Sequence, residues 1–469
     1  MRIISVFLTV IILLSCLWGG YALGNVVFDE NTESETIRHP IAEPPSLESH
    51  PAYFFETDTA LYPEILTSNW YPDTEYVKKM LESAMEGADK LNAENVYYYV
   101  NSAYGSLASY SNYLKYMDTL SITKGDTIYG AYTKEGVPTF GGGVGYPDIH
   151  TTGDYIVRSY TELLDACKKA SSGEVIFIPS DVSIDLTMEI KDADNKGYYV
   201  YLNEGVTLAS DRGYVREDGT VSTGAKLYGC GIDTPSITTG FVYCNKDARI
   251  TGITLQGPDG NRHLEHHYRS FSVINAPGHD YYYRFPIAGG VSILGDNVEI
   301  DNCELSGFSS YAIGVSAYEC YIHHNYIHHN QINGLGYGVS FGHGGGLIEY
   351  NLFNYNRHSI AGSGYGDSYY TARYNVDMGE SLDHVYDMHG GADRKDGTNI
   401  AGKYVEMYNN TFLTASRPFH IRGVPVEYYT FCHNILLNPV NQYNYGVLTG
   451  EKMKIYDNIF GIEKQTVVK

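Results

Sequence analysis

The sequence predicts an all-β protein whose C-terminal two thirds folds as a right-handed single-stranded parallel β-helix, which is a solenoid. The 469 residues include 50 Gly and 46 Tyr, a composition typical of turn-rich β proteins. Short apolar runs bounded by turn residues, such as 175–179 and 205–213, indicate strands at wide spacing. A pattern of the form apolar-x-apolar-x-x-Asn-x-apolar then recurs at the spacing of solenoid coils.

The Asn position of this pattern recurs about once per coil. Successive positions are separated by 22, 26, 24, 35, 24 and 24 residues, and the longest gap indicates an insertion of 11 residues, 35 against 24. Stacked amides can donate and accept along a column, so we expect these side chains to point inward and to serve the scaffold. The seven positions are Cys303, Asn325, Asn351, Asn375, Asn410, Asn434 and Asn458.

Three segments are expected along the chain. Residues 1–24 form a signal peptide or membrane anchor, because an apolar run follows a single basic residue. Residues 25–150 form an N-terminal extension that is partly helical, since apolar residues within 76–91 have helical spacing. Residues 151–469 form the β-helix domain, and an amphipathic segment at 160–170 predicts a helix that caps its first coil.

The N-terminal segment predicts a secreted or cell-surface protein. Cleavage after Gly24, lipid attachment at Cys16 and retention as an anchor all remain open, and contact with a membrane is expected only through such an attachment. The formal charge of −23 disfavours a nucleic-acid partner, and a monomer is expected. Cys303, Cys320 and Cys432 lie within strand-like segments, where buried free thiols are expected.

The capping helix, the segment Gly-Val-Thr-Leu-Ala-Ser-Asp-Arg-Gly at 205–213 and the Asn column together carry a family resemblance. Residues from about 160 to 469 resemble the pectate-lyase-like superfamily of right-handed β-helix proteins, including archaeal disaggregatase-type surface proteins. The resemblance implies a protein that holds long polysaccharides. It leaves the reaction open, because members include lyases, hydrolases, epimerases and noncatalytic adhesins.

A second strand in each coil provides the best catalytic candidates. Matching Ile360, Tyr386 and Ile421 as inward residues places an aspartate and an arginine in one outward file on adjacent coils, with histidines beside them. Imidazoles are the usual general bases at neutral pH, and an arginine can hold an anionic group during proton transfer. The predicted catalytic residues are Asp387, His389, His420 and Arg422.

Charged residues concentrate around the insertion in a chain that is otherwise acidic. The glycine-bounded segment 390–397 carries four charges and is predicted to form the rim of an active site. Arginine forks grip carboxylates in pairs, so an acidic polysaccharide is the expected ligand, held near residues 349–422. The predicted substrate-binding residues are Glu349, Arg357, His358, Arg373, His384, Arg394 and Arg417.

Two further patterns favour structural roles. The residues two places before the Asn position form a file that we interpret as a surface ladder of compatible charges rather than a substrate track. Adjacent histidine pairs, at 323–324 and 328–329, are predicted to be surface or turn residues, because neighbours on a strand face opposite sides. The members of the file are Asp301, His323, Glu349, Arg373 and Tyr408.

The expected activity is that of a polysaccharide lyase acting on uronates, in which His389 or His420 removes a proton while Arg422 or Arg394 neutralises the carboxylate. The family resemblance implies calcium as a neutralising cation, with Asp387, Asp393 and Asp396 as oxygen ligands. Two alternatives remain: a glycoside hydrolase that uses a pair of these carboxylates, and a noncatalytic surface β-helix that binds glycan or builds the envelope.

Overall fold

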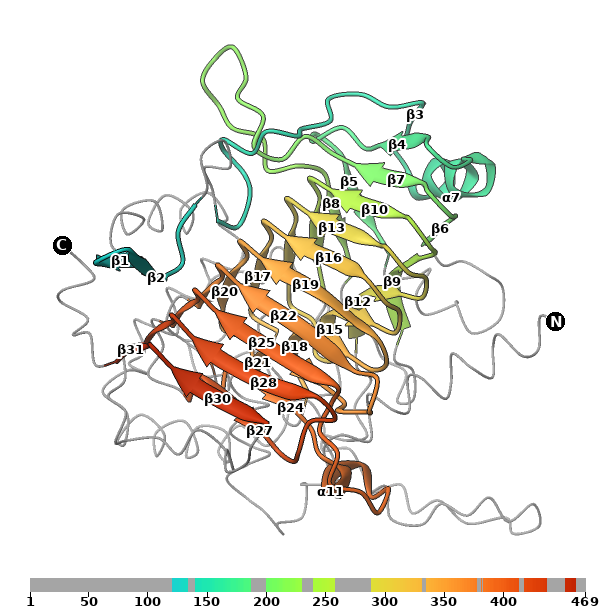
Figure 1. The fold of residues 1–469 in the computed structure, drawn as a ribbon. Helices are drawn as coiled ribbons and strands as arrows, with labels where there is room; N and C mark the ends of the chain where they lie inside the picture. Colours follow the sequence, from blue (N-terminus) through green and yellow to red (C-terminus); the bar gives the residue numbers. More distant parts are fainter. Residues whose placement is uncertain are drawn as a thin grey trace, which may run out of the picture.

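Within the described residues, the computed structural model is a parallel β-helix, as predicted (Figure 1). The structure describes residues 120–133, 140–186, 200–229, 239–257, 288–330, 335–377, 381, 383–412, 417–436 and 452–460. The predicted signal segment at 1–24 and the predicted helix at 76–91 lie outside these residues. Three long sheets of parallel strands surround one apolar core.

Each sheet takes one strand from successive coils. The first sheet contains β3 Tyr155–Ile156, β4 Val175–Phe177, β7 Thr207–Ala209, β10 Arg249–Thr251, β13 Glu299–Asp301, β16 Cys320–His323, β19 Gly345–Glu349, β22 Tyr369–Arg373, β25 Tyr404–Tyr408, β28 Tyr428–Cys432 and β30 Met453–Tyr456. The second contains β5 Ser183–Asp185, β8 Lys226–Tyr228, β11 Thr254–Gln256, β14 Glu304–Ser306, β17 Tyr326–His328, β20 Leu352–Asn354, β23 Val376–Asp377, β26 Thr411–Phe412, β29 Ile435–Leu436 and β31 Ile459–Phe460. The third contains β6 Val200–Leu202, β9 Thr239–Cys244, β12 Ala288–Ile293, β15 Tyr311–Val315, β18 Tyr337–Phe341, β21 His358–Gly362, β24 Tyr386–Met388 and β27 Phe419–Ile421.

The predicted capping helix is present as α7, Tyr160–Lys169. Ser159 caps its N-terminus by accepting a hydrogen bond from the backbone N–H of Glu162, and the helix buries Leu163, Ala166 and Cys167. Figure 1 shows α7 beside β4 and β6, at the end where the solenoid begins. The helix therefore covers apolar side chains of the first coils that no further coil would cover. Among the described residues, no helix is both long and apolar enough to cross a membrane.

The Asn column forms as predicted, at the corner between the first and second sheets. Asn325, Asn351, Asn375, Asn410 and Asn434 are all fully buried. From Asn351 onward, Oδ1 accepts hydrogen bonds from the backbone N–H and the side-chain amide of the asparagine one coil earlier, as Asn375 does from Asn351 at 3.0 and 3.1 Å. Oδ1 of Asn325 accepts from the backbone N–H of Cys303. Nδ2 in turn donates to a backbone carbonyl, Ile348 O in the case of Asn375. The column thus satisfies backbone groups at the corners from Cys303 to Asn434.

The residue before each column position adopts a left-handed backbone conformation, with φ between 49° and 56°. This conformation turns the chain sharply between two sheets, and it disfavours side chains other than Gly, Asn and Asp. Several corner residues are nevertheless aromatic, and Tyr350 stacks on His324 at 4.9 Å and on Tyr374 at 5.3 Å between ring centroids. The corner residues are Asn302, His324, Tyr350, Tyr374, Asn409, His433 and Asp457.

The adjacent histidine pairs are not on the surface, because all four imidazoles are buried, but the second member of each pair lies at a turn, as the other predicted alternative has it. The left-handed conformation of His324 and His329 brings each ring back toward its neighbour, and the Nδ1 atoms lie 2.8 Å apart in the first pair and 2.7 Å in the second. His323 also contacts Glu299 through Nε2 at 2.8 Å. The prediction assumed that adjacent side chains on a strand point to opposite faces. The left-handed conformation of the second histidine in each pair breaks that alternation.

The described part of the N-terminal extension packs along the same corner. The strands β1 Ser121–Lys124 and β2 Thr127–Gly130 form an antiparallel hairpin. Gly130 N–H donates to His433 O, Gly141 N–H to Tyr350 O and Gly143 N–H to the Asn302 side chain, at 2.7–2.8 Å. Residues 120–133 and 140–146 therefore lie along several coils, in the direction opposite to coil order. The prediction of helix in the extension concerns residues outside this part.

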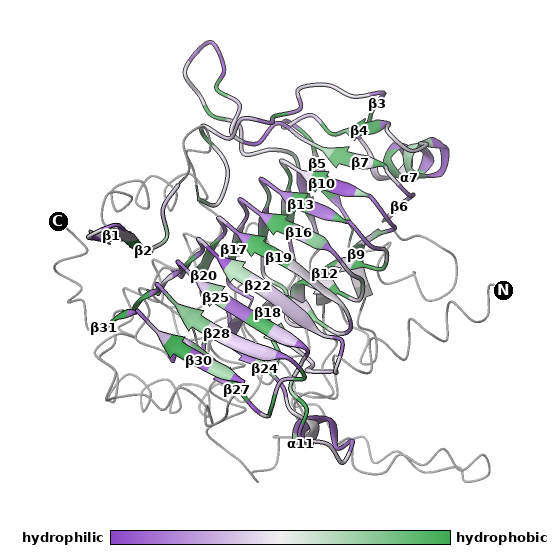
Figure 2. Cartoon of the chain, in the orientation of Figure 1, coloured by the Kyte–Doolittle hydropathy of each residue, from purple (hydrophilic) through white to green (hydrophobic). Residues whose placement is uncertain are grey.

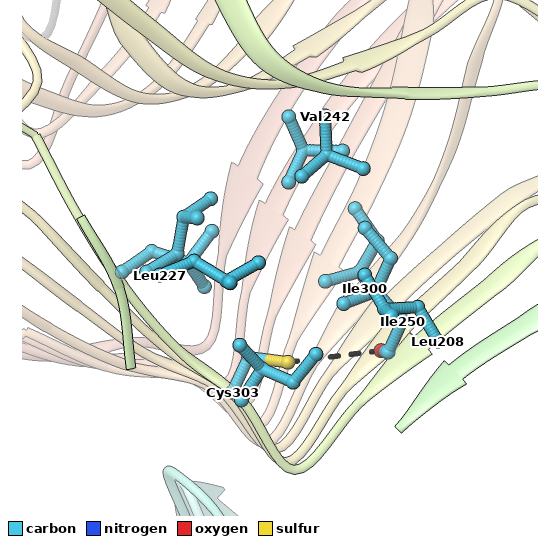
Figure 3. Close-up of a pocket in the computed structure, with 10 residues that line it drawn as sticks. Leu208, Leu227, Val242, Ile250, Ile300 and Cys303 are labelled. Atoms are coloured by element: carbon cyan, nitrogen blue, oxygen red, sulfur yellow. Dashed lines mark hydrogen bonds between the residues drawn. The ribbon is translucent and has the colours of Figure 1, made fainter. Parts of the chain in front are cut away.

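Apolar side chains fill the space between the three sheets. Figure 2 shows both hydrophobic and hydrophilic stretches on the strands, and in strands such as β25 buried and half-exposed residues alternate, as the inward and outward positions of a strand require. The cavity in Figure 3 lies within this core between early coils, and all ten of its lining residues are apolar or cysteine. Cys303 there donates from Sγ to Ile250 O at 3.7 Å. The cavity is thus core space, and Cys303, Cys320 and Cys432 are buried free thiols as predicted.

Replacing Asn375 by Leu tests the column. Leucine removes the acceptor for Asn351 and the donors to Ile348 and Asn410, so buried polar groups lose their partners. We expect the free energy of unfolding to fall by about 1–3 kcal/mol in a denaturant titration. The control is Asn399→Leu, an exposed asparagine outside the column, which should change stability by less than about 0.5 kcal/mol. Equal losses in the two variants would contradict the structural role of the column.

Asp377 provides a test of pH dependence, because its buried side chain occupies the register position of Phe353 and Phe412 on neighbouring coils. Burial raises the pKa of Asp377 to about 8. The folded state therefore binds a proton that the unfolded chain releases above pH 4, and this residue's contribution to stability falls as pH rises from about 4 to about 8.

Asp377→Asn should remove this contribution. We expect the difference in unfolding free energy between the variant and wild type to grow in favour of the variant from pH 5 to pH 8. Asp218→Asn, at a fully exposed aspartate, serves as the control and should show no such trend. A constant difference between Asp377→Asn and wild type across this pH range would refute the buried protonated state.

Candidate functional site

The predicted catalytic residues lie on the third sheet near the C-terminal end of the solenoid, on β24, β27 and the segments that follow them. Tyr386 pairs with Phe419, and Asp387 pairs with His420. The sequence-based register, which matched Tyr386 with Ile421, is therefore wrong by two residues. Because side chains alternate with a period of two, this shift leaves the predicted outward face unchanged.

Asp387 is the centre of the site. Its carboxylate is fully buried, and it accepts two hydrogen bonds from Arg422, from Nη2 to Oδ2 at 2.6 Å and from Nε to Oδ1 at 3.2 Å. His389 Nε2 lies 2.8 Å from Oδ2, and His384 Nε2 lies 3.2 Å from Oδ1. Burial alone would raise the pKa of Asp387, but the charges of Arg422, His389 and His384 hold it well below its usual value. This carboxylate is therefore an anion at neutral pH.

The histidines around Asp387 differ in burial and in charge. His389 is buried, and burial followed by the charge of Arg422 lowers its pKa. Burial lowers the pKa of His384 as well, but the carboxylates of Asp387 and Asp383 outweigh burial, so its pKa is raised overall. His420 is half-buried, and burial together with the charge of His384 lowers its pKa to about 4. Of these three imidazoles, His420 is the one that reaches solvent.

The charged insertion forms a short helix, α11 Gly391–Arg394, beside the site (Figure 1). Asp393 accepts a hydrogen bond from the backbone N–H of Gly390 at 3.0 Å and another from Arg422 Nη1 at 3.1 Å. Gly390 has no room for a side chain, since an added Cβ would lie 1.9 Å from Arg422 O. The insertion thus lies against the predicted catalytic residues, and it fixes the guanidinium of Arg422 between two carboxylates.

The structure does not place Arg394 where it could bind substrate. Its buried guanidinium donates to Ser363 O at 2.9 Å, to Ile400 O at 2.8 Å and to the Asp396 carboxylate at 2.8 Å. These backbone contacts hold the insertion on the solenoid. The prediction that Arg394 neutralises a substrate carboxylate is therefore wrong, because its donors are occupied within the protein.

The other predicted substrate-binding residues divide between two sheets. Glu349 and Arg373 pair with each other at 2.5 Å on the first sheet, on a different face of the solenoid, so they do not join the Asp387 cluster. Their file has the predicted register from Asp301 to Tyr408 and forms the ladder of compatible charges. This outcome removes Glu349 and Arg373 from the candidate site.

Four predicted substrate-binding residues do lie near Asp387. His358 is fully buried with Nε2 3.8 Å from the Asp387 carboxylate, and its ring lies 3.9 Å from that of His384 between centroids. Arg357 is buried, and its guanidinium lies 3.5 Å from Asp383. The fourth, Arg417, is half-buried and forms no ion pair with a described residue. Its backbone carbonyl accepts a hydrogen bond from Val385 N–H at 2.8 Å, which places Arg417 beside the start of β24, and its charge is among the causes that lower the pKa of His420.

The predicted calcium ligands do not converge. Asp387 and Asp393 both bind the guanidinium of Arg422, which occupies the space between them. Asp396 instead binds Arg394 and accepts from Thr398, whose hydroxyl and backbone hydrogen bonds lower the pKa of Asp396 to about 2. An arginine already supplies the positive charge that a cation would bring, so these three carboxylates do not form a common oxygen site.

Two residues of the site escaped sequence reasoning. Asp383 hydrogen-bonds His384 Nδ1 at 3.0 Å, although it belongs to no strand and to no repeated position. Tyr337 is buried on β18 and stacks on His358 at 5.7 Å between ring centroids. Alignment of β18 with β21 would have found Tyr337, because Tyr337 and His358 are register partners. Nothing in the sequence pattern marks Asp383.

No protein-family model matches this chain, and no curated protein sequence is similar to it. Among solved structures, the chain is similar to an alginate lyase from Paenibacillus sp. (13% identity, TM-score 0.41, 66% of this chain and 95% of that one). It is also similar to a lacto-N-biosidase from Eubacterium ramulus (11%, 0.32, 65% and 54%) and to the A-module of a mannuronan C-5 epimerase from Azotobacter vinelandii (13%, 0.30, 66% and 100%). Likeness at this level assigns no activity.

Arg422→Ala tests how the site is held together. The substitution leaves the fully buried Asp387 carboxylate without its main counter-charge, and such a loss costs about 3–5 kcal/mol of stability. We expect a clear drop in the thermal midpoint for Arg422→Ala and little change for Arg417→Ala, whose guanidinium forms no ion pair with a described residue. Equal midpoints for Arg422→Ala and wild type would refute this electrostatic role.

Proposed function

We propose that this protein is an exported or cell-surface enzyme that degrades an acidic polysaccharide, and that it is a lyase acting on uronate residues. The observation that carries the proposal is a half-exposed imidazole, His420, three residues after a half-buried cation, Arg417, that forms no ion pair with a described residue. Proton removal next to a carboxylate requires an accessible base and a cation that can bind that carboxylate.

The reaction uses these groups in a defined order. Arg417 binds the uronate carboxylate, which makes the proton on C5 more acidic. His420 removes that proton, the electron pair forms a double bond between C4 and C5, and the bond from C4 to the glycosidic oxygen breaks. The imidazolium of His420 then returns its proton to the leaving oxygen. The products are a new chain end and an unsaturated uronate.

The buried members of the cluster position this machinery. His384 packs edge to face on His420 at 4.9 Å between ring centroids, and Asp387 holds His384 and Arg422 in place. His389 and Asp387 were predicted to be catalytic, but both are buried and lie in contact with each other within the protein. In this proposal they orient the exposed residues and do not touch substrate.

The same geometry disfavours hydrolysis by the predicted carboxylate pair. A glycoside hydrolase needs one carboxylic acid that keeps its proton near neutral pH and one free carboxylate. Asp387 is held as an anion by Arg422, Asp393 binds the same arginine, and Asp396 is paired with Arg394. None of the three is available as a proton donor, so the imidazole-based lyase reaction is the better fit.

The test compares cleavage of polymers of mannuronic, guluronic, galacturonic and glucuronic acid with a neutral glucan as the control substrate. A lyase produces both ultraviolet-absorbing unsaturated ends and new reducing ends. For His420→Ala we expect turnover to fall by roughly 10²-fold or more, with an unchanged thermal midpoint. The matched control is His343→Ala, at a half-exposed histidine paired with Asp367, which should keep wild-type turnover.

Three outcomes would overturn the proposal. New reducing ends without ultraviolet absorbance would assign hydrolysis. Exchange of the C5 proton with deuterated solvent without chain cleavage would assign a reaction that stops at proton transfer. Glycan binding without either change would assign the noncatalytic role. Assays with and without calcium also test the predicted cofactor, which the paired carboxylates of this site do not favour.

A further inference from the structure

The buried ring of His384 lies between two carboxylates and turns one nitrogen toward each of them. Its Nδ1 lies 3.0 Å from Oδ1 of Asp383, and its Nε2 lies 3.2 Å from Oδ1 of Asp387. A neutral imidazole carries one N–H and one lone pair, so one of these oxygens would then face a lone pair. An imidazolium presents an N–H to both oxygens. The contacts of the ring therefore favour its charged form.

Neither carboxylate is a better place for the extra proton. Both oxygens of Asp387 accept hydrogen bonds from Arg422. Oδ1 of Asp383 also accepts from the backbone N–H of His384 at 2.8 Å, and Arg357 lies 3.5 Å from Oδ2. Burial would raise the pKa of Asp383, but the hydrogen bond from His384 and the nearby positive charges hold it well below its usual value. Both carboxylates are therefore anions beside the ring.

The charges of the cluster lead to the same conclusion. Its ion pairs join three carboxylates to two guanidinium groups, so a neutral His384 would leave one negative charge without compensation. Such a deficit is costly next to the fully buried Asp387, and an imidazolium at His384 removes it. The carboxylates are those of Asp383, Asp387 and Asp393, and the guanidinium groups are those of Arg357 and Arg422.

The adjacent ring of His358 does not carry this charge. Its Nδ1 lies 2.5 Å from the backbone carbonyl oxygen of His384, and its Nε2 is 3.8 Å from Asp387. The two rings lie 3.9 Å apart between centroids, so a second positive charge would be repelled by the first. Burial and then the charge of His384 lower the pKa of His358. His384 is thus the charged member of this pair.

The ring of His384 also lies against the proposed base. It packs on His420 at 4.9 Å between centroids, with the two ring planes 85° apart. A like charge at about 4–6 Å disfavours protonation of an imidazole. Burial and then the charge of His384 lower the pKa of His420, with smaller contributions from Arg422 and Arg417, while Asp387 acts in the opposite direction.

We propose that His384 is a buried imidazolium and a positioning residue for the base, because its charge keeps His420 in the neutral form that can accept a proton. This role rests on the proposed lyase function of His420. An acidic polysaccharide attracts protons and favours protonation of an imidazole beside it. The fixed positive charge of His384 offsets that effect, so the base stays neutral when such a substrate binds.

Nuclear magnetic resonance of the full chain with labelled histidines measures both protonation states without substrate. A chelator in the buffer excludes a bound cation as the source of charge, and circular dichroism establishes that the chain is folded at each pH. We expect His384 to lose its proton only above the ordinary midpoint of about 6.5, and His420 to titrate near pH 4. A His384 midpoint below about 6.5, or a His420 midpoint near 6.5, would overturn the proposal.

His384→Gln removes the charge and keeps a side chain that can form hydrogen bonds. We expect the pKa of His420 to rise by about 1–2 units, and the acid limb of kcat/KM to move to higher pH by the same amount. A merely structural loss would lower kcat/KM at every pH and leave this limb in place. His384→Lys restores a positive charge and should return the limb toward its wild-type position.

The matched control is His323→Gln, at another buried imidazole, 2.8 Å from Glu299 on the first sheet, and it should leave the pKa of His420 unchanged. An unchanged pKa of His420 in folded His384→Gln would overturn the proposed role of His384, whether or not the wild type cleaves polyuronates. A raised pKa in that variant, together with no cleavage by the wild type, would overturn the lyase function and still support the charge on His384.

Discussion

Each asparagine of the buried column is shared between coils, because Oδ1 accepts from the previous coil while Nδ2 donates to a carbonyl. The corner before it requires a left-handed backbone, which costs free energy for residues such as Tyr350 and Tyr374. Amide hydrogen bonds and ring stacking at the same corner offset that cost. Since the coils from Asn325 to Asn458 share this corner, the column holds these coils in one register with their neighbours.

A fixed register turns distant residues into neighbours. The segment that carries Asp387 is separated in sequence by more than 25 residues from His358 and from Arg422, yet the parallel pairing of β21, β24 and β27 brings all three together. The insertion adds Asp393 to the same cluster without disturbing the coil, because Arg394 fastens it to backbone carbonyls. The stacked coils thus fix where the side chains of the cluster lie, and the insertion adds a further charged side chain, Asp393, to them.

Charge compensation limits what this cluster can do. A fully buried carboxylate is tolerated only with strong counter-charges, and Asp387 obtains them from Arg422 and from the surrounding imidazoles. Asp387 in turn holds Arg422 and His384 in place, so these residues fix the geometry of the site. The proposed reaction therefore uses the partly exposed residues His420 and Arg417, and the buried His384 packs on the ring of His420.

The sequence by itself determined the solenoid, the inward Asn column and the outward face of Asp387, because each depends on a local pattern with a fixed period. It could not determine the register between β24 and β27, where a shift of two residues preserves every inward and outward position. Nor could it separate the first-sheet pair Glu349 and Arg373 from the third-sheet cluster. The sequence shows which side chains are charged, but only the tertiary structure determines which of them lie close together. Coulomb and hydrogen-bond energies depend on distance, and the stacking of the coils sets these distances.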